Sequence, residues 1–128
     1  MDDEIDIPIK EALFDLYLSG EKKEEYLKPT DKWIRRLFLV RDGQTGQMRQ
    51  MSEIESQVFA CKPDDLTQWQ ENGLLVPVIF HTAVFRTKHN RRTQKRMVLG
   101  PAKLDKGQKE WGAPDEQVLV LRIGDKVE

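Results

Sequence analysis

The sequence predicts an α+β fold built on an antiparallel or mixed β-sheet. Near the N-terminus Ile5, Ile7 and Ile9 alternate with polar residues and a proline, which is the period of a half-buried strand. Residues 117–123 form a nearly continuous apolar run, as expected for a central strand covered on both faces. After the first strand, helical patterns precede a run of mostly strand patterns, and this order favours α+β over alternating α/β units.

Length and composition are those of one folded domain. The chain has 128 residues, of which 38% are hydrophobic, and it includes three Trp, five Phe and two Tyr. No apolar run approaches the ~20 residues of a membrane span, and the acidic N-terminus is unlike a signal peptide. Cys61 is the only cysteine and there are two His, so neither an internal disulfide nor an ordinary zinc site is expected. We expect a cytoplasmic protein with no cofactor, no metal and no membrane segment.

Two predicted helices follow the first strand. Apolar residues at near-helical spacing indicate the first helix, and Gly20 suits the left-handed position after a helix. The second helix begins at Thr30 or Asp31, either of which can cap it. Because Pro8 has no backbone N–H, the strand before the first helix is expected at a sheet edge. The expected ranges are a strand at 5–9, a helix at 11–18, a strand at 24–27, a helix from about 30 to 37, and a buried strand or helix end at 37–40.

The segment 41–73 differs in composition from its surroundings. Residues 41–51 are rich in turn formers and have no apolar period, which indicates a loop. Residues 52–59 are compatible with either a strand or a helix. A short helix is expected within 63–73, where acidic residues occupy the first turn and an Asn-Gly pair provides a stop.

The rest of the chain is expected to consist of strands separated by exposed loops. Residues 88–95 have almost no apolar content, so they are expected to form a loop. A second loop at 107–114 contains Trp111, and Gly100-Pro101 makes one strand irregular. The expected strands are 74–80, 83–87, 97–104 and the central one at 117–123.

A charged segment directly after the first helix resembles a known motif. A glycine turn there precedes Lys22 and Glu25, and the alternative is a solvated charged turn. The run 14–26, with Trp33 and Arg36-Leu37 just beyond, resembles the opening of ASCH domains. In that family a helix ends in G-x-K, followed three residues on by Glu or Thr and usually by Arg two residues later. Gly20, Lys22 and Glu25 fit this pattern, whereas Leu27 stands where the arginine is expected.

Two other segments extend the resemblance. Residues 110–114 and the strand that follows them look like the tail of phage and bacterial ASCH proteins, and 84–86 resemble a strand of the same group. The match covers about 9–37 and 78–124, so 41–73 is a less family-like insertion. The family implies a PUA-like small β-barrel of about five or six strands with short flanking helices and a cleft beside the motif. It implies binding of RNA, nucleotides or modified nucleosides. Some small members are amidohydrolases acting on N4-acylated cytidine, and others have been assigned nuclease activity.

The resemblance nominates a ligand-binding set beside this cleft, in which Lys22 and Glu25 are also the candidate catalytic residues. Glu25 occupies the position of a catalytic threonine in the amidohydrolases, and no glutamate between Asn72 and Lys109 supplies their third residue. The glutamates around Lys22 favour its charged form, which suits binding rather than base catalysis. The nominated residues are Gly20, Lys22, Glu25, Tyr26 and Trp111.

A second candidate surface is a cluster of basic residues. Residues 86–109 carry nine bases and one acid, whereas residues 1–30 carry nine acids and four bases. Long cationic side chains on an exposed loop suit phosphate contact, and the alternative is a solvated loop kept charged to prevent edge pairing. The residues assigned to nucleic-acid contact are Arg86, Lys88, Arg91, Arg92, Lys95 and Arg96.

Three functional hypotheses follow. The first is a binding module for RNA, a nucleotide or a nucleoside, and the second is a small hydrolase acting on an acylated nucleoside or on RNA. The third is a protein-interaction domain that uses the insertion. Trp33 and Trp69 are expected in the core, whereas Trp111 is expected on the wall of the cleft.

Overall fold

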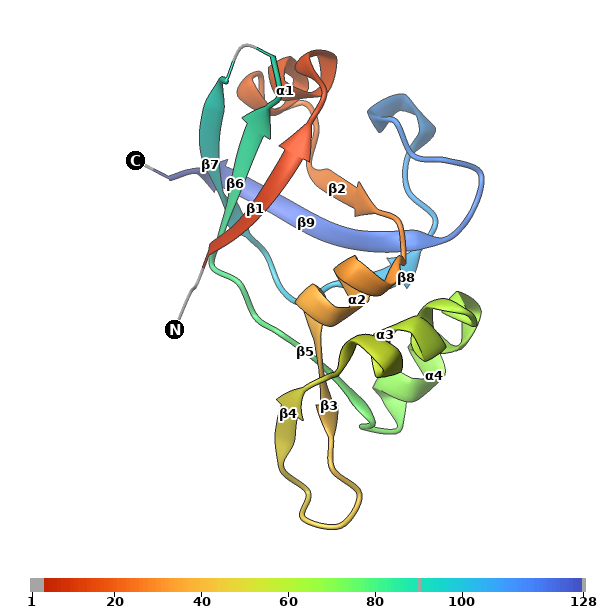
Figure 1. Cartoon of the computed structure of the whole chain (residues 1–128). Helices are drawn as coiled ribbons and strands as arrows, with labels where there is room; N and C mark the ends of the chain where they lie inside the picture. The colour runs from red at the N-terminus through yellow and green to blue at the C-terminus, as the bar shows by residue number, and fades with distance from the viewer. Residues whose placement is uncertain (1–3, 90, 128) are drawn as a thin grey trace.

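The computed structural model describes residues 4–89 and 91–127. Within these residues, four α-helices accompany a curled mixed sheet whose five-strand path forms a half-barrel (Figure 1). β1 runs parallel to β6, and the other neighbouring strands along the path are antiparallel. The path is β1 (Glu4–Ile9), β6 (Thr82–Thr87), β7 (Thr93–Val98), β9 (Val118–Lys126) and β2 (Glu24–Leu27), and β8 (Lys103–Asp105) also pairs with β9.

Two of the strongest strand predictions are confirmed. β9 pairs with β2, β7 and β8, and its residues 118–121 are buried, as expected for a central strand. β1 lies at one end of the strand path, where the missing N–H of Pro8 costs no ladder hydrogen bond on the open side. The helix α1 (Glu11–Leu18) and the strand β2 also occupy their expected ranges.

The segment expected to be an insertion contributes β4 to a second, three-stranded sheet of order β4-β3-β5, whose other two strands flank the segment. The expected loop at 41–51 contains the strand β4, because Asp42 Oδ1 accepts hydrogen bonds from the N–H groups of Gln44 and Thr45 and closes a hairpin. The tip of this hairpin projects from the body of the molecule (Figure 1). The elements are α2 (Asp31–Leu37), β3 (Phe38–Arg41), β4 (Met48–Gln50), α3 (Glu53–Ala60), the 3-10 helix η1 (Pro63–Asp65), α4 (Leu66–Glu71) and β5 (Leu75–Pro77).

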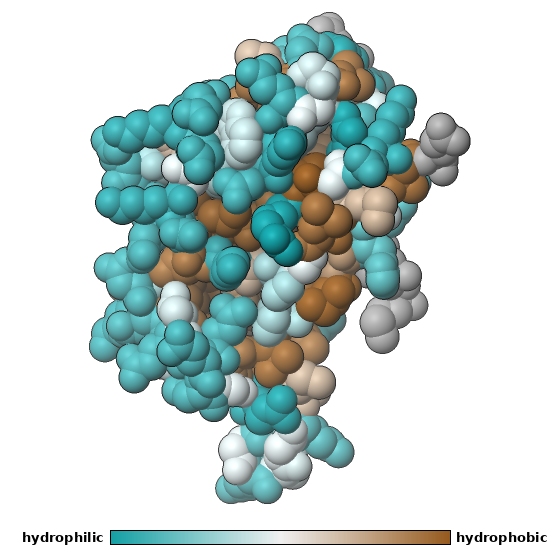
Figure 2. Space-filling model, turned by 180° about the vertical axis from the view of Figure 1, so that it is seen from behind, coloured by the Kyte–Doolittle hydropathy of each residue, from teal (hydrophilic) through white to brown (hydrophobic). Residues whose placement is uncertain are grey.

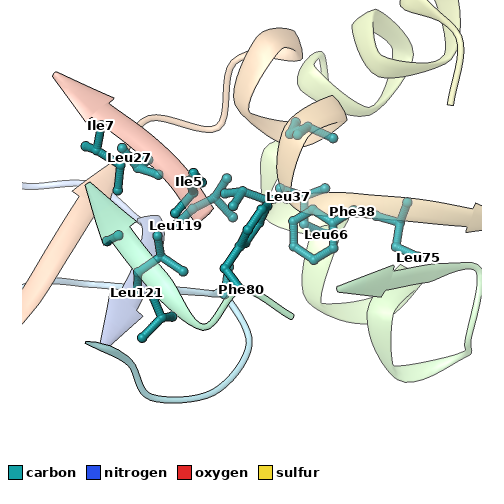
Figure 3. Packing of buried hydrophobic residues seen from close by; sticks show 14 of the residues in the cluster. Ile5, Ile7, Leu27, Leu37, Phe38, Leu66, Leu75, Phe80, Leu119 and Leu121 are labelled. Atoms are coloured by element: carbon teal, nitrogen blue, oxygen red, sulfur yellow. The ribbon is translucent and has the colours of Figure 1, made fainter. Parts of the chain in front are cut away.

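The two sheets share one hydrophobic core. Figure 3 shows Phe80 between the barrel residues Ile5 and Leu119 and the side chains of Leu37 and Phe38. All of these side chains are at most 5% exposed. Trp33 and Trp69 pack against this core and are half-buried, so the insertion is joined to the half-barrel by continuous apolar contact.

Two strand predictions in the second half were wrong in range. The strand expected at 74–80 is only β5, which pairs with β3 in the second sheet and not with the barrel. The expected loop at 88–95 is shorter, because β7 begins at Thr93, and the strand expected at 97–104 is split between β7 and β8. In β7 the inward positions carry Gln94 and Arg96 before Val98, so a strand lies where the composition is polar.

The face opposite to that of Figure 1 carries an interrupted band of hydrophobic residues among hydrophilic ones (Figure 2). Exposed large apolar side chains of the described residues include Met97, Leu99 and Ile79. On α3, Ile54 and Val58 lie one turn apart and are 74% and 60% exposed. Among residues 4–89 and 91–127, no helix combines the length and the apolarity that crossing a bilayer would need.

The undecided segment 52–59 is the helix α3, and a capping box begins it. Ser52 Oγ accepts from the Glu55 N–H at 3.1 Å, and Glu55 Oε1 accepts from the Ser52 N–H at 2.9 Å. Arg49 donates to both oxygens of the same carboxylate, at 2.7 and 2.8 Å. The S-x-x-E spacing is therefore a local signal that could have identified this segment as a helix.

Glu55→Gln is expected to lower the free energy of unfolding by about 1 kcal/mol at pH 7, a modest value because the carboxylate is one-third exposed. The hydrogen bonds from Arg49 and Ser52 lower the pKa of Glu55 to about 2, below its ordinary value of 4.5. The stabilisation is therefore complete above pH 4.5 and is lost as the pH falls toward 2. Urea unfolding at pH 7 and pH 3 should show a difference between the two proteins that shrinks at pH 3, and a pH-independent difference would contradict this role.

Candidate functional site

A sharp turn between α1 and β2 positions Lys22 and Glu25. Gly20 adopts a left-handed conformation (φ 78°) that L side chains rarely adopt. The Lys22 N–H then donates to the Leu16 carbonyl at 3.1 Å, which draws the chain back toward the helix. In β2 the alternation of half-buried and buried residues places Glu25 on the inner face.

The Lys22 ammonium is almost completely buried. Its side chain is 1% exposed, and Nζ donates a 2.8 Å hydrogen bond to the main-chain carbonyl of Trp111. Nζ lies 4.0 Å from Glu25 Oε1, and 5.1 and 5.3 Å from the ring centroids of Tyr17 and Tyr26, which is within reach of cation–π attraction. An ammonium has three donors, so Lys22 can bind further acceptors beyond this one carbonyl.

Two tyrosines hold the Glu25 carboxylate. The Tyr17 hydroxyl donates to Oε2 at 2.9 Å, and the N–H of Tyr26 donates to Oε1 at 2.8 Å. Tyr17 is buried and stacks on Phe85 with 4.2 Å between the ring centroids. The sequence analysis did not include Tyr17 in the site. Its place in the sequence could have identified it, because a tyrosine on the core face of a helix has a buried hydroxyl that needs a polar partner.

Burial shifts the pKa of both ionisable groups toward their neutral forms. Desolvation lowers the pKa of Lys22, and the Glu25 charge opposes this shift only in part. Desolvation raises the pKa of Glu25 against the opposing effects of Lys22, the Tyr17 hydroxyl and the Tyr26 N–H. Glu25 favours the charged form of Lys22, as expected, but desolvation has the larger effect, so the net shift of the Lys22 pKa is downward.

A segment after β8, residues 106–113, contacts Lys22 and Tyr26, and we call it the closing segment. It contains the 3-10 helix η2 (Lys109–Trp111). Gly107 packs on Tyr26 so closely that an added Cβ would lie 2.4 Å from Cε1 of the ring. The N–H of Gln108 donates to the hydroxyl of the same tyrosine at 2.9 Å. The segment is thus docked on the site by specific contacts.

The expected ligand-binding residues do meet, but in a closed arrangement rather than beside an open cleft. Lys22, Glu25 and Tyr26 lie together beneath the closing segment. Trp111 touches Lys22 through its carbonyl, and its side chain is half-buried. Gly20 contributes by shaping the turn. Cavities of about 770 and 390 Å³ are lined by other residues.

Gly107→Ala is expected to destabilise the protein by about 1–3 kcal/mol and to loosen the closing segment. The new methyl would lie 2.4 Å from Tyr26 Cε1 and 2.7 Å from Ala113 Cβ, so one side must move. Hydrogen exchange of the Gln108 amide should become faster than in the parent protein. Gly43→Ala is the matched control, because an added Cβ there meets nothing within 4 Å. Parent-like stability and exchange in Gly107→Ala would contradict this packing.

Three of the six basic residues form ion pairs with acids of β1 and α1. The basic cluster is therefore not a loop of unpaired cations. Arg92 also lies over the ring of Phe14, with its guanidinium carbon 4.3 Å from the ring centroid. Part of the charge asymmetry of the sequence is therefore neutralised between neighbouring elements. The pairs are Arg86 Nε–Asp6 Oδ1 at 3.1 Å, Lys95 Nζ–Glu4 Oε2 at 3.0 Å, Arg92 Nη1–Glu11 Oε2 at 3.3 Å and Arg92 Nη2–Asp15 Oδ1 at 2.9 Å.

Arg96 belongs to the core and not to an exposed loop. It is 8% exposed, its Nε donates to Gln94 Oε1 at 2.9 Å, and its Nη2 donates to the Tyr17 carbonyl oxygen. That carbonyl belongs to the last turn of α1, where the partial negative charge of the helix favours a cation. Lys88 and Arg91 are exposed between β6 and β7, and the ion-paired Arg86 and Lys95 are also exposed.

Among the described residues, no group of three or more His, Cys, Asp or Glu side chains could hold a metal ion. The chemistry available at the site is therefore that of an ammonium, a carboxyl group and two phenols. Comparisons with protein-family models, with curated proteins and with solved structures give no match to this chain.

Proposed function

We propose that this protein is an ASCH-family domain with a PUA-like barrel that binds RNA or a nucleotide through Lys22 and Glu25. The half-barrel is compatible with such a fold. The motif residues Gly20, Lys22 and Glu25 lie at the start of β2, which is the end strand of the path. The single observation that carries the binding function is the hydrogen bond from Lys22 Nζ to a carbonyl oxygen.

A main-chain carbonyl is chemically similar to the carbonyl groups on the edges of pyrimidine and guanine bases. The ammonium that binds the Trp111 oxygen can therefore bind a base carbonyl in its place. Glu25, 4.0 Å away, can accept an N–H from the same base edge. Buried ionisable pairs are costly to fold, and perturbed pKa values cluster at functional sites, which supports a binding role for this pair.

Ligand entry requires the closing segment to move, because it occupies a donor of Lys22 and packs on Tyr26. When it moves, Lys22 loses the Trp111 carbonyl and Tyr26 loses the contact with Gly107. A base carbonyl then replaces the lost acceptor, and the freed face of the Tyr26 ring can stack on the base. Binding and displacement of the segment are therefore coupled.

Lys22→Met is expected to weaken binding of cytidine, uridine or a short RNA by about 1–3 kcal/mol, the contribution of a charge-assisted hydrogen bond. Lys23→Met is the matched control, because Lys23 is adjacent and exposed. Calorimetric titration with each probe measures the affinity, and thermal melts establish that the variants are folded. Equal affinity in parent and Lys22→Met, or equal losses in both variants, would reject the site.

The second candidate function is hydrolysis of an N4-acylated cytidine, and the direction of the Lys22 pKa favours it. A lowered lysine pKa increases the fraction of neutral amine, which is the form that acts as a base. A folded protein that hydrolyses N4-acetylcytidine, and loses this turnover in Lys22→Met but not in Lys23→Met, would establish the enzyme. Binding without turnover leaves the binding module as the function.

A further inference from the structure

A cavity of about 770 Å³ lies beside α2, and we call it the α2 cavity. Its wall comes from α2, from β1, from the strands β3 and β4, and from residues next to the second sheet. None of its lining residues belongs to the Lys22 site, so it is a separate place on the molecule. Its volume falls within the range of pockets that hold small organic ligands.

One wall of the α2 cavity is apolar and supported from behind. Trp33 and Val78 pack against the hydrophobic core, and Phe80 is part of it (Figure 3). Trp33 is only half-buried, so part of the indole is open to solvent while its contacts with the core hold it in place. A supported, partly exposed aromatic face is suited to stacking against another planar ring.

The rim of the cavity is cationic. Lys32, Arg35 and Arg36 line it, against one acid, Asp6, whose Oδ1 already lies 3.1 Å from Arg86 Nε. Lys32 and Arg36 are both exposed.

The three bases differ in how firmly they are engaged. Arg35 Nη1 donates to Ser56 Oγ at 2.9 Å and lies 3.9 Å from an Asp31 oxygen. The guanidinium of Arg36 lies over the Phe80 ring, 5.7 Å from its centroid. No carboxylate of the described residues lies within 4.0 Å of Lys32 or Arg36, so two bases are available to an anion.

We propose that the α2 cavity is a nucleotide-binding site, in which Trp33 stacks on the base and Lys32 and Arg36 bind the phosphate. An aromatic face beside two uncompensated cations matches a ligand with one planar ring and one anionic group. Guanidinium groups bind phosphate oxygens in a bidentate manner, and lysine binds them as a point charge. The nucleotide is either free or one unit of a single strand.

The test is calorimetric titration of the full chain with AMP, with adenosine and with a short oligoadenylate. In Lys32→Gln/Arg36→Gln the AMP affinity should fall about tenfold or more, because both phosphate contacts are lost, whereas adenosine binding should not change. Trp33→Ala should weaken the binding of both AMP and adenosine. Lys62→Gln is the control, since Lys62 is exposed and lies outside the cavity lining. Adenine has no ring carbonyl for the Lys22 ammonium to bind, so AMP reports on the α2 cavity and not on the base-carbonyl contact proposed for the Lys22 site.

The outcomes are distinct. Oligoadenylate binding that is tighter than AMP binding and equally sensitive to the double variant assigns the site to a strand, and equal affinities assign it to a free nucleotide. AMP affinity that survives the double variant, or that falls as much in Lys62→Gln, would overturn the proposal. A Trp33→Ala protein that melts like the parent yet binds both ligands unchanged would also overturn it.

Discussion

Glu25→Ala is expected to lower the free energy of unfolding by about 3–5 kcal/mol at pH 7, because it leaves the Lys22 ammonium buried without its counter-charge. Both side chains are almost fully buried, 1% and 6% exposed, so water cannot replace the lost carboxylate. The Tyr17 hydroxyl loses an acceptor as well. Urea unfolding measures the loss. Glu21→Ala is the control, since Glu21 is exposed and should change stability by less than about 0.5 kcal/mol.

The double variant Lys22→Met/Glu25→Leu should recover most of this loss, because it removes both buried charges together. The two substitutions are then strongly non-additive, as expected for residues in direct interaction. A double variant as unstable as Glu25→Ala would mean that the loss comes from packing and not from an unpaired charge. The double variant should also fail to bind the nucleoside probes, so stability and binding are separated in one protein.

The instability of Glu25→Ala should decrease as the pH rises from 7 to 10. Burial lowers the pKa of Lys22 in the folded state, and removing Glu25 takes away the effect that opposes this shift. Between the folded pKa and the unfolded value of 10.5, the unfolded state binds more protons, so stability rises with pH. Unfolding curves at pH 7 and pH 10 test this, and a deficit that grows with pH would contradict it.

Local signals were sufficient for part of the fold. The helix α1 ends where Gly20 predicts, the edge position of β1 follows from Pro8, and β9 is central as its apolar run requires. Each of these predictions rests on the chemistry of a few neighbouring residues: a left-handed glycine, a missing N–H, and a strand with two covered faces. Such constraints act within the segment itself, so the sequence displays them.

The errors in the fold arise where a residue is satisfied by a distant partner. In β7 the inward residues Gln94 and Arg96 are polar, and their hydrogen bonds go to carbonyls of α1, almost eighty residues earlier. No local pattern shows that these polar side chains are buried. For β5 the local pattern predicts the strand correctly. Its apolar residues do not show which of the two sheets it joins, because that depends on its distant partner β3.

The sequence predicted which residues of the candidate site lie together, but not that the site is closed. The spacing of Gly20, Lys22 and Glu25 predicted that Lys22 and Glu25 lie close together, since a glycine turn and a short strand fix their relation. The closing segment lies more than eighty residues further along the chain, so its contact with Lys22 is not a local property. The ion pairs of the basic cluster were not visible in the sequence for the same reason, because the acids that pair with Arg86, Arg92 and Lys95 lie on β1 and α1.

Arg96→Ala is expected to lower the free energy of unfolding by about 2–4 kcal/mol, through the loss of two hydrogen bonds from a buried charged donor. Arg96 links Gln94 of β7 to the Tyr17 carbonyl at the end of α1, and Gln94 in turn donates to the Phe14 carbonyl at 3.1 Å. Arg96→Lys should recover little, because an ammonium on a flexible stem cannot hold the two acceptors in the geometry of a planar guanidinium. Lys95→Ala, next in the chain but exposed and paired on the surface, should cost less than about 1 kcal/mol.

The same arginine positions the Lys22 site, and this gives the prediction a second readout. The Gly20 N–H donates to the Tyr17 carbonyl at 3.1 Å, and the Lys22 N–H donates to the Leu16 carbonyl, so the turn depends on the end of α1 that Arg96 holds. Hydrogen exchange of the Gly20 and Lys22 amides should therefore become faster in Arg96→Ala than in Lys95→Ala. If Arg96→Ala is destabilised but these two amides keep the exchange rates of the parent protein, Arg96 stabilises the barrel without shaping the turn.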